Sequence, residues 1–237
     1  MRLIASRPLP HAPSPYLILA VLCVGIFVAA LDQTVVYGAL ADMMTDLDLP
    51  VTKLDQAAWI VIGYLLGYTL AMPLMGRISD VYGHRRIYIL CLGVFLMGSV
   101  LVALSNSLQW MVAARVIQAV GGGAMVPIAM AIVADIFPGR SRAISFGIIG
   151  AAVEAGAALG PFYGGALSYF LDWRWIFWIN LPIGLMVILI VYLYLGPGAR
   201  AKGRIDYIGG FLLAAALALL TLGLAQESGG AHFLTYT

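Results

Sequence analysis

Charged side chains are scarce in this chain of 237 residues, making up only 10% of it, whereas 62% of its residues are hydrophobic. A soluble fold of this size needs far more charged and polar surface to stay in water. Proteins with several membrane spans have such a composition, because their outer surface faces lipid. The composition therefore excludes an ordinary soluble domain and predicts an all-α membrane protein embedded in a lipid bilayer.

Residues that carry metal, redox or hydrolytic chemistry are also few. The two cysteines, Cys23 and Cys91, lie in apolar segments and lack the Cys-x-x-Cys or Cys/His spacing of a metal or redox site. The chain has no Gly-x-Ser-x-Gly, His-Glu-x-x-His or P-loop motif. Its basic residues form no run that would suggest binding of nucleic acid. We therefore expect no enzyme activity or catalytic residue, no metal, no cofactor and no nucleic-acid partner.

Apolar segments of the length that a membrane span requires recur along the whole chain. The hydrocarbon core of a bilayer needs about 20 helical residues. The segments of this kind cover residues 17–43, 54–75, 87–104, 110–136, 143–171, 175–195 and 205–225. A cleaved signal peptide is the alternative for the first segment, but that segment is longer than a typical signal core and contains Asp32. We therefore predict seven membrane spans.

Positive charges between these segments fall mainly on one side of the predicted membrane, and short loops rich in arginine and lysine stay in the cytoplasm. The basic residues on the richer side are Arg2, Arg7, Arg77, Arg85, Arg86, Arg140, Arg142, Arg200, Lys202 and Arg204. Only Lys53 and Arg174 lie in the loops of the other side. The tail at 1–16 is therefore expected in the cytoplasm of a cell, or inner, membrane, and the tail at 227–237 outside it.

The most polar stretch of the chain, residues 76–87, lies between the second and third segments. Its glycines allow close backbone approach and positive φ, and its aspartate can pair with an arginine or cap a helix. The stretch resembles the Gly-x-x-x-Asp-x-x-Gly-Arg-Lys loop of the major facilitator superfamily at Gly76, Asp80, Gly83, Arg85 and Arg86, with His84 where arginine is common. An ordinary basic turn is the alternative reading. Either way, the stretch predicts a tight cytoplasmic turn.

Two arginines that follow the fourth segment, Arg140 and Arg142, belong to the same predicted side as this turn. They could reach Asp80. We expect this network to hold the cytoplasmic side closed while the transport cavity faces outward, as a transporter with two states requires.

Three charged residues, Asp32, Arg115 and Glu154, are expected to lie near the centre of the bilayer. A charged side chain near the centre of a bilayer costs about 2.5 to 3.5 kcal/mol on insertion scales, so such residues usually face a wet cavity or a partner. We hypothesise that Asp32 binds a proton or a cationic substrate. A permanent ion pair with Arg115 is the alternative. Glu154 is either a second titratable or cation-binding site or a partner for Arg115.

Further motifs resemble the fourteen-span drug:proton antiporters of the same superfamily. The surroundings of Asp32 resemble the Leu-Asp-x-Thr-Val signature of their first helix. The fourth-helix motif of the superfamily is matched at Arg115, Gln118 and Gly121, and the resemblance implies that this arginine tunes proton release from an acid. The motif associated with antiporters is matched at Gly156, Gly160, Pro161, Gly164 and Gly165.

The resemblance implies a six-helix bundle over residues 17–196, built from two inverted repeats of three helices. A cytoplasmic linker at 197–204, an additional span at 205–226 and a tail at 227–237 would follow, as in the N-terminal portion of a longer protein. The implied function is proton-driven efflux of small, amphipathic, cationic compounds, completed by a missing second half and allowing a periplasmic adaptor. A membrane scaffold or subunit without transport activity is the alternative.

Overall fold

The structure of the chain is a computed structural model that describes residues 14–196 and 207–227. This part of the chain is almost entirely helical and contains no strand. Its long helices are α1 (Pro15–Asp46), α3 (Trp59–Tyr82), α4 (His84–Ala103), α5 (Leu108–Ile136), α6 (Gly139–Phe170), α7 (Trp175–Tyr194) and α8 (Tyr207–Glu227). The one-turn helix α2 (Leu54–Ala57) leads into α3, after a short 3₁₀ turn at Val51–Lys53. The predicted all-α fold is confirmed.

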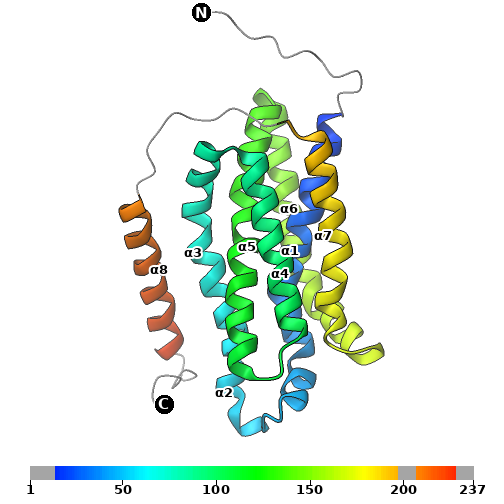
Figure 1. The fold of residues 1–237 in the computed structure, drawn as a ribbon, viewed down its shortest axis with the longest axis vertical. Helices are drawn as coiled ribbons and strands as arrows, with labels where there is room; N and C mark the ends of the chain where they lie inside the picture. Colours follow the sequence, from blue (N-terminus) through cyan, green and yellow to red (C-terminus); the bar gives the residue numbers. More distant parts are fainter. Residues whose placement is uncertain (1–13, 197–206, 228–237) are drawn as a thin grey trace, which may run out of the picture.

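Six of the described helices are long and apolar enough to cross a membrane, and these six form one bundle (Figure 1). The seventh predicted helix is α8, whose apolar stretch covers Ile208–Thr221. It lies beside α3, where Gly210 faces the side chain of Leu74. The predicted linker at 197–204 and most of both predicted tails lie outside the described residues.

Helix α1 crosses α6, and α3 crosses α5, over the longest interhelical contacts of the bundle. Taking α1, α3 and α4 as one group and α5, α6 and α7 as the other, the first helix of each group packs against the second helix of the other group. This exchange of partners is the arrangement that two inverted three-helix repeats produce.

Close contact between α1 and α6 depends on three glycines spaced four residues apart on one face of α6. A Cβ atom on Gly156, Gly160 or Gly164 would collide with a backbone carbonyl oxygen of α1. Thr34 of α1 donates a hydrogen bond of 2.8 Å to the carbonyl of Ala157 at this crossing. Small residues at such positions let two membrane helices approach each other closely. Gly165, by contrast, has room for a Cβ atom.

The polar stretch at 76–87 is helical on both sides of one residue, Gly83. This glycine ends α3 and precedes α4 with φ of +99°, a conformation that residues with a Cβ atom rarely adopt. The predicted tight turn is therefore present. It is shorter than the polar segment suggested, because the residues from Gly76 to Tyr82 continue the helix instead of forming a loop.

The apolar interior is divided into two clusters with a polar layer between them. One cluster includes Leu22 and Ile128, and the other includes Val35 and Phe177. Along each of α1, α4, α5 and α7, the change from one cluster to the other coincides with a buried polar residue. The fold thus places a thin polar layer across the middle of the bundle.

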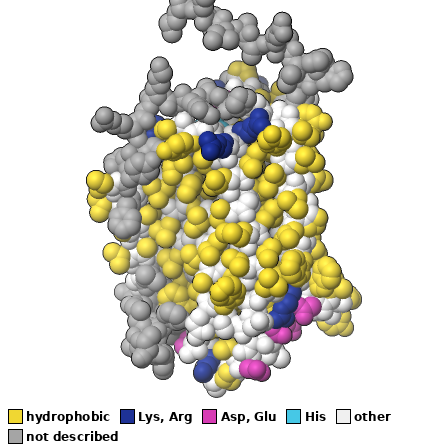
Figure 2. All heavy atoms as spheres, viewed as in Figure 1, with side chains coloured by type: hydrophobic (Ala, Val, Ile, Leu, Met, Phe, Trp, Pro, Cys, Tyr) yellow, Lys and Arg dark blue, Asp and Glu magenta, His cyan; other side chains and the backbone are white. Residues whose placement is uncertain are grey.

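Charged side chains gather near the two ends of the bundle, and hydrophobic side chains cover its middle (Figure 2). We call the end that holds the α3–α4 and α5–α6 turns the basic end, because it carries Arg77, Arg85, Arg86, Arg140 and Arg142. The opposite end carries Asp42, Asp46 and Asp172 together with Arg174. An apolar belt between two charged rims is the surface expected of a bundle that spans a bilayer.

Candidate functional site

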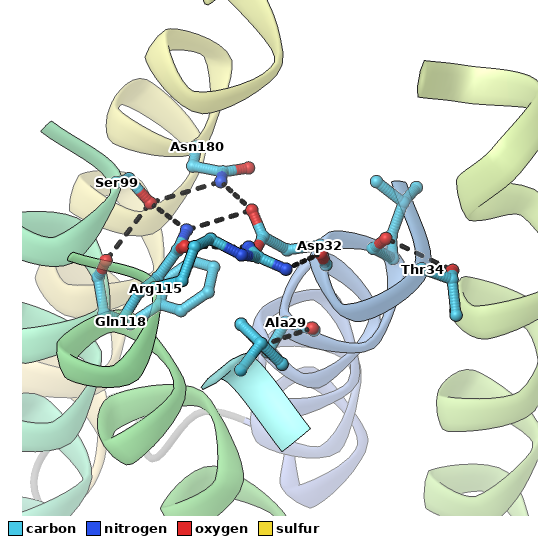
Figure 3. Close-up of polar contacts among 10 residues, drawn as sticks. Ala29, Asp32, Thr34, Ser99, Arg115, Gln118 and Asn180 are labelled. Carbon is cyan, nitrogen blue, oxygen red and sulfur yellow. Dashed lines mark hydrogen bonds and ion pairs between the residues drawn. The ribbon is translucent and has the colours of Figure 1, made fainter. Parts of the chain in front are cut away.

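Asp32, in the middle of α1, is the acid around which the polar layer is arranged (Figure 3). Its side chain is fully buried. One carboxylate oxygen, Oδ2, forms an ion pair with Nη1 of Arg115. The other, Oδ1, accepts hydrogen bonds from Nε2 of Gln118 at 3.0 Å and from Nδ2 of Asn180 at 2.9 Å. The ion pair between Asp32 and Arg115, the alternative to a role of Asp32 in binding a proton or cation, is therefore present in this structure.

Arg115 reaches Asp32 from α5 and is also fully buried. Its Nη2 donates to the backbone carbonyl of Asp32 at 3.0 Å, and its Nη1 donates to Oε1 of Gln118 at 2.9 Å. The guanidinium lies 4.0 Å from the ring centroid of Tyr64, whose hydroxyl is held by a 3.0 Å bond to the carbonyl of Ala29. A buried cation needs such partners, because removing one ion from water costs on the order of several kcal/mol.

Gln118 and Ser99 extend the cluster from α5 to α4. Nε2 of Gln118 donates to Oγ of Ser99 at 2.8 Å, and the Ser99 hydroxyl donates to the carbonyl of Phe95 at 3.1 Å. Both side chains are fully buried. The predicted alignment of Arg115 and Gln118 on one inward face of the helix is therefore present, and both residues contact the acid directly.

Sequence reasoning missed Asn180 of α7, together with Tyr64 of α3 and Ser99 of α4. Asn180 lies within the predicted span 175–195, where it was not singled out. The structure buries its side chain, and Nδ2 donates both to Asp32 and, at 3.3 Å, to Ser99. One signal could have found it: an amide inside an apolar span has no partner on its own helix, so it must find one on another helix.

The cluster joins five helices through a single carboxylate. Asp32 comes from α1, Tyr64 from α3, Ser99 from α4, Arg115 and Gln118 from α5, and Asn180 from α7. All these side chains are buried in this conformation. A proton on Asp32 would cancel the negative charge that faces Arg115, Gln118 and Asn180, so the contacts of α1 with α5 and α7 depend on the charge of one acid. Such an arrangement can couple proton binding to helix movement.

Glu154 does not join the cluster. It lies on an exposed face of α6, whereas the buried face of that helix carries Gly156 and Gly160 and packs against α1. The partners of Arg115 are Asp32 and Gln118, so the alternative role of Glu154 as a partner for this arginine is not seen. A Cβ atom added to Gly147 or Gly150, on the same helix, would meet nothing within 4 Å, so this face of α6 is open.

Gly121 of α5 is the glycine of the fourth-helix motif that the sequence singled out. It serves helix packing. A Cβ atom there would collide with the backbone of α4 at Cys91 and Phe95. The residue lies one turn from Gln118, so it brings α4 and α5 together beside the acid.

The basic end holds a second polar cluster around the α3–α4 turn. His84 is nearly buried, with Nδ1 3.1 Å from Oγ of Ser79 and Nε2 3.5 Å from Oδ2 of Asp135 at the end of α5. Arg85 donates a 3.0 Å bond to the carbonyl of Leu195 at the end of α7, and its guanidinium lies 4.8 Å from the ring centroid of Tyr192. The turn therefore connects α3 and α4 to α5 and α7.

The gate residues expected to bond one another across this end are arranged differently. Asp80 forms its ion pair with Arg77 on the same helix, at 3.6 Å, rather than with Arg140 or Arg142. Nε of Arg142 donates to the carbonyl of Phe137 at 2.9 Å. Arg86 and Arg140 are exposed. The contact of this turn with α5 runs instead through His84, which begins α4, lies against Ser79 of α3 and pairs with Asp135.

No group of three or more histidine, cysteine, aspartate and glutamate side chains is arranged to hold a metal ion within the described ranges, 14–196 and 207–227.

Comparison with known proteins relates the whole bundle to one family. A family model described as "Major Facilitator Superfamily" matches residues 22–225. A triacylglyceride transporter of Mycobacteroides abscessus is 43% identical over 202 residues, which cover 84% of this chain and 39% of that protein. A triacylglyceride transporter of Mycobacterium tuberculosis is 40% identical over 216 residues, which cover 88% of this chain and 42% of that protein. The chain thus spans about two fifths of the length of these curated relatives.

Solved structures share the fold at lower sequence identity. A human organic anion transporter superposes with a TM-score of 0.63 at 24% identity, over 88% of this chain and 55% of that one. A bacterial homologue of the human lysosomal transporter Spinster, in an inward-facing and unoccupied conformation, superposes with a TM-score of 0.65 at 24% identity, over 82% and 47% of the two chains.

Proposed function

The chain belongs to the major facilitator superfamily, and from this premise we propose that its six-helix bundle is one half of a proton-coupled exporter of an apolar lipid. In this proposal α1 to α7 alternate between two conformations together with a second half. Asp32 takes up a proton in one conformation and releases it in the other. The proton gradient supplies the energy, and no cofactor is needed.

The observation that carries the proposal is the buried cluster around Asp32. An acid whose carboxylate accepts hydrogen bonds from α5 and α7 changes all these contacts when it is protonated. Hydrogen bonds to a charged acceptor are roughly twice as strong as those between neutral groups. Protonation therefore loosens the junction of the helices, and loss of the proton tightens it again. A ligand or proton shifts an equilibrium between two states only by such differential interactions.

The proposed substrate is a triacylglyceride or a comparably apolar lipid. Relatives at 40 to 43% identity are named triacylglyceride transporters. The acid in the polar layer is fully buried and paired, so in this conformation it offers a cationic substrate no free carboxylate. The exposed side of α6 carries large apolar side chains such as Leu159 and Phe162, which suit contact with acyl chains.

Export of an amphipathic cation is a second candidate, and Glu154 is the observation that favours it. Its carboxylate lies exposed on an otherwise apolar and small-residue face of α6. An exposed acid at membrane depth can attract an organic cation. If this second function holds, Glu154→Gln abolishes export of a lipophilic cationic dye. If the lipid proposal alone holds, the substitution leaves lipid transfer intact.

For the orientation, we propose that the basic end faces the cytoplasm of a cell membrane, as the positive-inside rule predicts. The N-terminus then lies in the cytoplasm. The second half of the transporter is the partner that the proposal requires, whereas a periplasmic adaptor stays a prediction from the family resemblance.

The test is transport by the protein as its gene encodes it, reconstituted in lipid vesicles that contain a fluorescent triacylglyceride. We expect transfer of this lipid to follow an imposed pH gradient, and Asp32→Asn to abolish that dependence because the amide cannot exchange a proton. Asp42→Asn is the matched control, since Asp42 lies on the same helix but is exposed and accepts a hydrogen bond from Ser168.

Transfer by Asp32→Asn with an unchanged dependence on the pH gradient would contradict the proposal. A natural protein that moves neither the lipid nor the cationic dye would favour the scaffold alternative.

A further inference from the structure

Two amide side chains donate to the same oxygen of Asp32, and they differ in their freedom to rearrange. Nε2 of Gln118 and Nδ2 of Asn180 both approach Oδ1, at 3.0 and 2.9 Å. The remaining oxygen, Oδ2, faces the guanidinium of Arg115. A proton added to Asp32 therefore goes to Oδ1, because Oδ2 is next to a permanent positive charge.

Protonation of Oδ1 creates a conflict between donors. The new O–H group needs an acceptor, but both amides present N–H groups to this oxygen. One amide must then turn by half a rotation about its last side-chain bond, so that its oxygen replaces its nitrogen. A buried donor left without an acceptor would otherwise cost about 1 to 3 kcal/mol.

Gln118 is not free to make this rotation. Its Oε1 accepts a 2.9 Å bond from Arg115, and its Nε2 donates at 2.8 Å to Ser99. Turning the amide would place its nitrogen against the guanidinium and its oxygen against Ser99, whose hydroxyl already donates to Phe95. Both ends of Gln118 are therefore fixed by neighbours that do not change when Asp32 binds a proton.

Asn180 is less constrained, because its rotation gives up the longer 3.3 Å bond to Ser99 and turns no nitrogen toward the guanidinium. Figure 3 shows its side-chain nitrogen directed toward Asp32 and Ser99 and its oxygen directed away from the cluster, and no hydrogen bond to that oxygen is found among the described residues. After rotation, the oxygen accepts the proton of Asp32. Ser99 loses one donor but keeps the bond from Gln118.

We propose that Asn180 is a positioning residue that turns its side-chain amide when Asp32 is protonated. The hydrogen bond between α7 and α1 thereby changes with the protonation of Asp32. The inference rests on the proposed proton-carrying role of Asp32. It places the response on α7 because Arg115 keeps its 3.0 Å bond to the backbone carbonyl of Asp32 whether or not the carboxylate is charged. The hydrogen bond between α1 and α5 thus persists, whereas the hydrogen bond between α1 and α7 changes from a charge-assisted bond to a neutral one.

Other ionisable groups near Asp32 do not remove the need for this rotation. Arg115 faces it from α5, Tyr64 from α3 and Tyr163 from α6. Arg115 has no acceptor to offer. The hydroxyl of Tyr64 donates to the carbonyl of Ala29, and no hydrogen bond joins Tyr163 to Asp32 among the described residues. From α7 the uncharged Asn180 reaches the acid, and the uncharged Ser99 of α4 bonds Asn180 and Gln118.

The test is infrared difference spectroscopy between acid and neutral pH on the protein in lipid vesicles, made with ¹³C-labelled asparagine. Two bands are followed: the carboxylic acid band that Asp32→Asn removes, and the asparagine amide band that Asn180→Leu removes. This chain has only one other asparagine, Asn106, so Asn106→Ser simplifies the labelled signal. We expect both bands to change together over the same pH range.

Each outcome has a separate meaning. An acid band for Asp32 without a change at the Asn180 amide overturns this inference and leaves the proposed function standing. If Asp32 gains no proton while the protein stays folded, the proposed function fails, and this inference fails with it.

Transport supplies a second readout that does not require the labelled band. Asn180→Leu is expected to lower proton-driven transport about tenfold, the effect of losing one hydrogen bond to a charged group, and to flatten its dependence on the pH gradient. Asn180→Ser should restore the dependence, because a hydroxyl can both donate and accept. A Leu variant that folds and keeps the full pH dependence overturns the inference.

Discussion

The polar cluster in the middle of the bundle and the one at its basic end use the same kinds of group in different surroundings. Both pair a carboxylate with a basic side chain, and both connect α4, α5 and α7. In the middle, the side chains of Asp32 and Arg115 are no more than 1% exposed. At the basic end, the side chains of His84 and Asp135 are 10% and 49% exposed. Water can therefore replace a lost partner at the end of the bundle but not in its middle.

This difference separates two tasks that the proposed alternating access requires. A buried pair holds a large energy difference between its charged and neutral states, so it suits the coupling of a proton to helix packing. A half-exposed pair contributes little and can break and form again as one end opens. Arg85 adds a contact to the last carbonyl of α7, the helix that also carries Asn180. The two clusters therefore act on the same helix at different depths.

The largest effect is expected from Arg115→Leu. This change leaves the Asp32 carboxylate buried without its counter-charge, so the free energy of unfolding should fall by about 3 to 5 kcal/mol. Asp135→Asn, the matched change at the basic end, should lower it by less than about 1 kcal/mol. Thermal unfolding in detergent micelles compares the two variants directly.

The double variant Asp32→Asn with Arg115→Leu sharpens this comparison. It removes both charges, so it should unfold at a higher temperature than Arg115→Leu alone. If Arg115→Leu is no less stable than Asp135→Asn, burial does not distinguish the two clusters and the comparison fails.

The sequence was sufficient to predict the spans of the bundle and the residues of the ion pair, because hydropathy marks the helices and a charge inside an apolar span must find a partner. It did not reveal Asn180, since one amide hardly changes the hydropathy of α7. Nor did it place Glu154. Small residues lie on both sides of α6, with Gly156 buried and Gly150 exposed, so their spacing does not tell which side contacts α1.

Helix ends were also harder to predict than spans. Polar residues such as Arg77 and Asp80 mark the limit of the apolar segment, yet they continue α3 to Tyr82 and pair along it. Hydropathy reports where a helix leaves the lipid, not where its hydrogen bonds end. Gly83 ends the helix because its backbone conformation is one that other residues rarely adopt.

A smaller effect is expected from Gly83→Ala. At the basic end the backbone turn, rather than the exposed charges, should determine stability. A methyl group at φ of +99° is strained, so the substitution should lower the free energy of unfolding by about 1 to 3 kcal/mol. Gly93→Ala in α4 is the control, because a Cβ atom there meets nothing within 4 Å and alanine favours a helix by up to about 1 kcal/mol. Equal unfolding temperatures for the two variants would refute the strain argument.

The smallest effect is expected from Asp80→Asn, which removes the ion pair with Arg77 at the basic end. The two side chains are 39% and 51% exposed, so the free energy of unfolding should change by no more than about 1 kcal/mol. The change should disappear in about 1 M salt, where the screening length falls to about 3 Å. The loss caused by Arg115→Leu should persist in the same salt, because ions do not enter the buried layer. Measuring both variants at low and high salt therefore tests whether access to water separates the two clusters, and a salt-sensitive loss in Arg115→Leu would show that the middle of the bundle is wet.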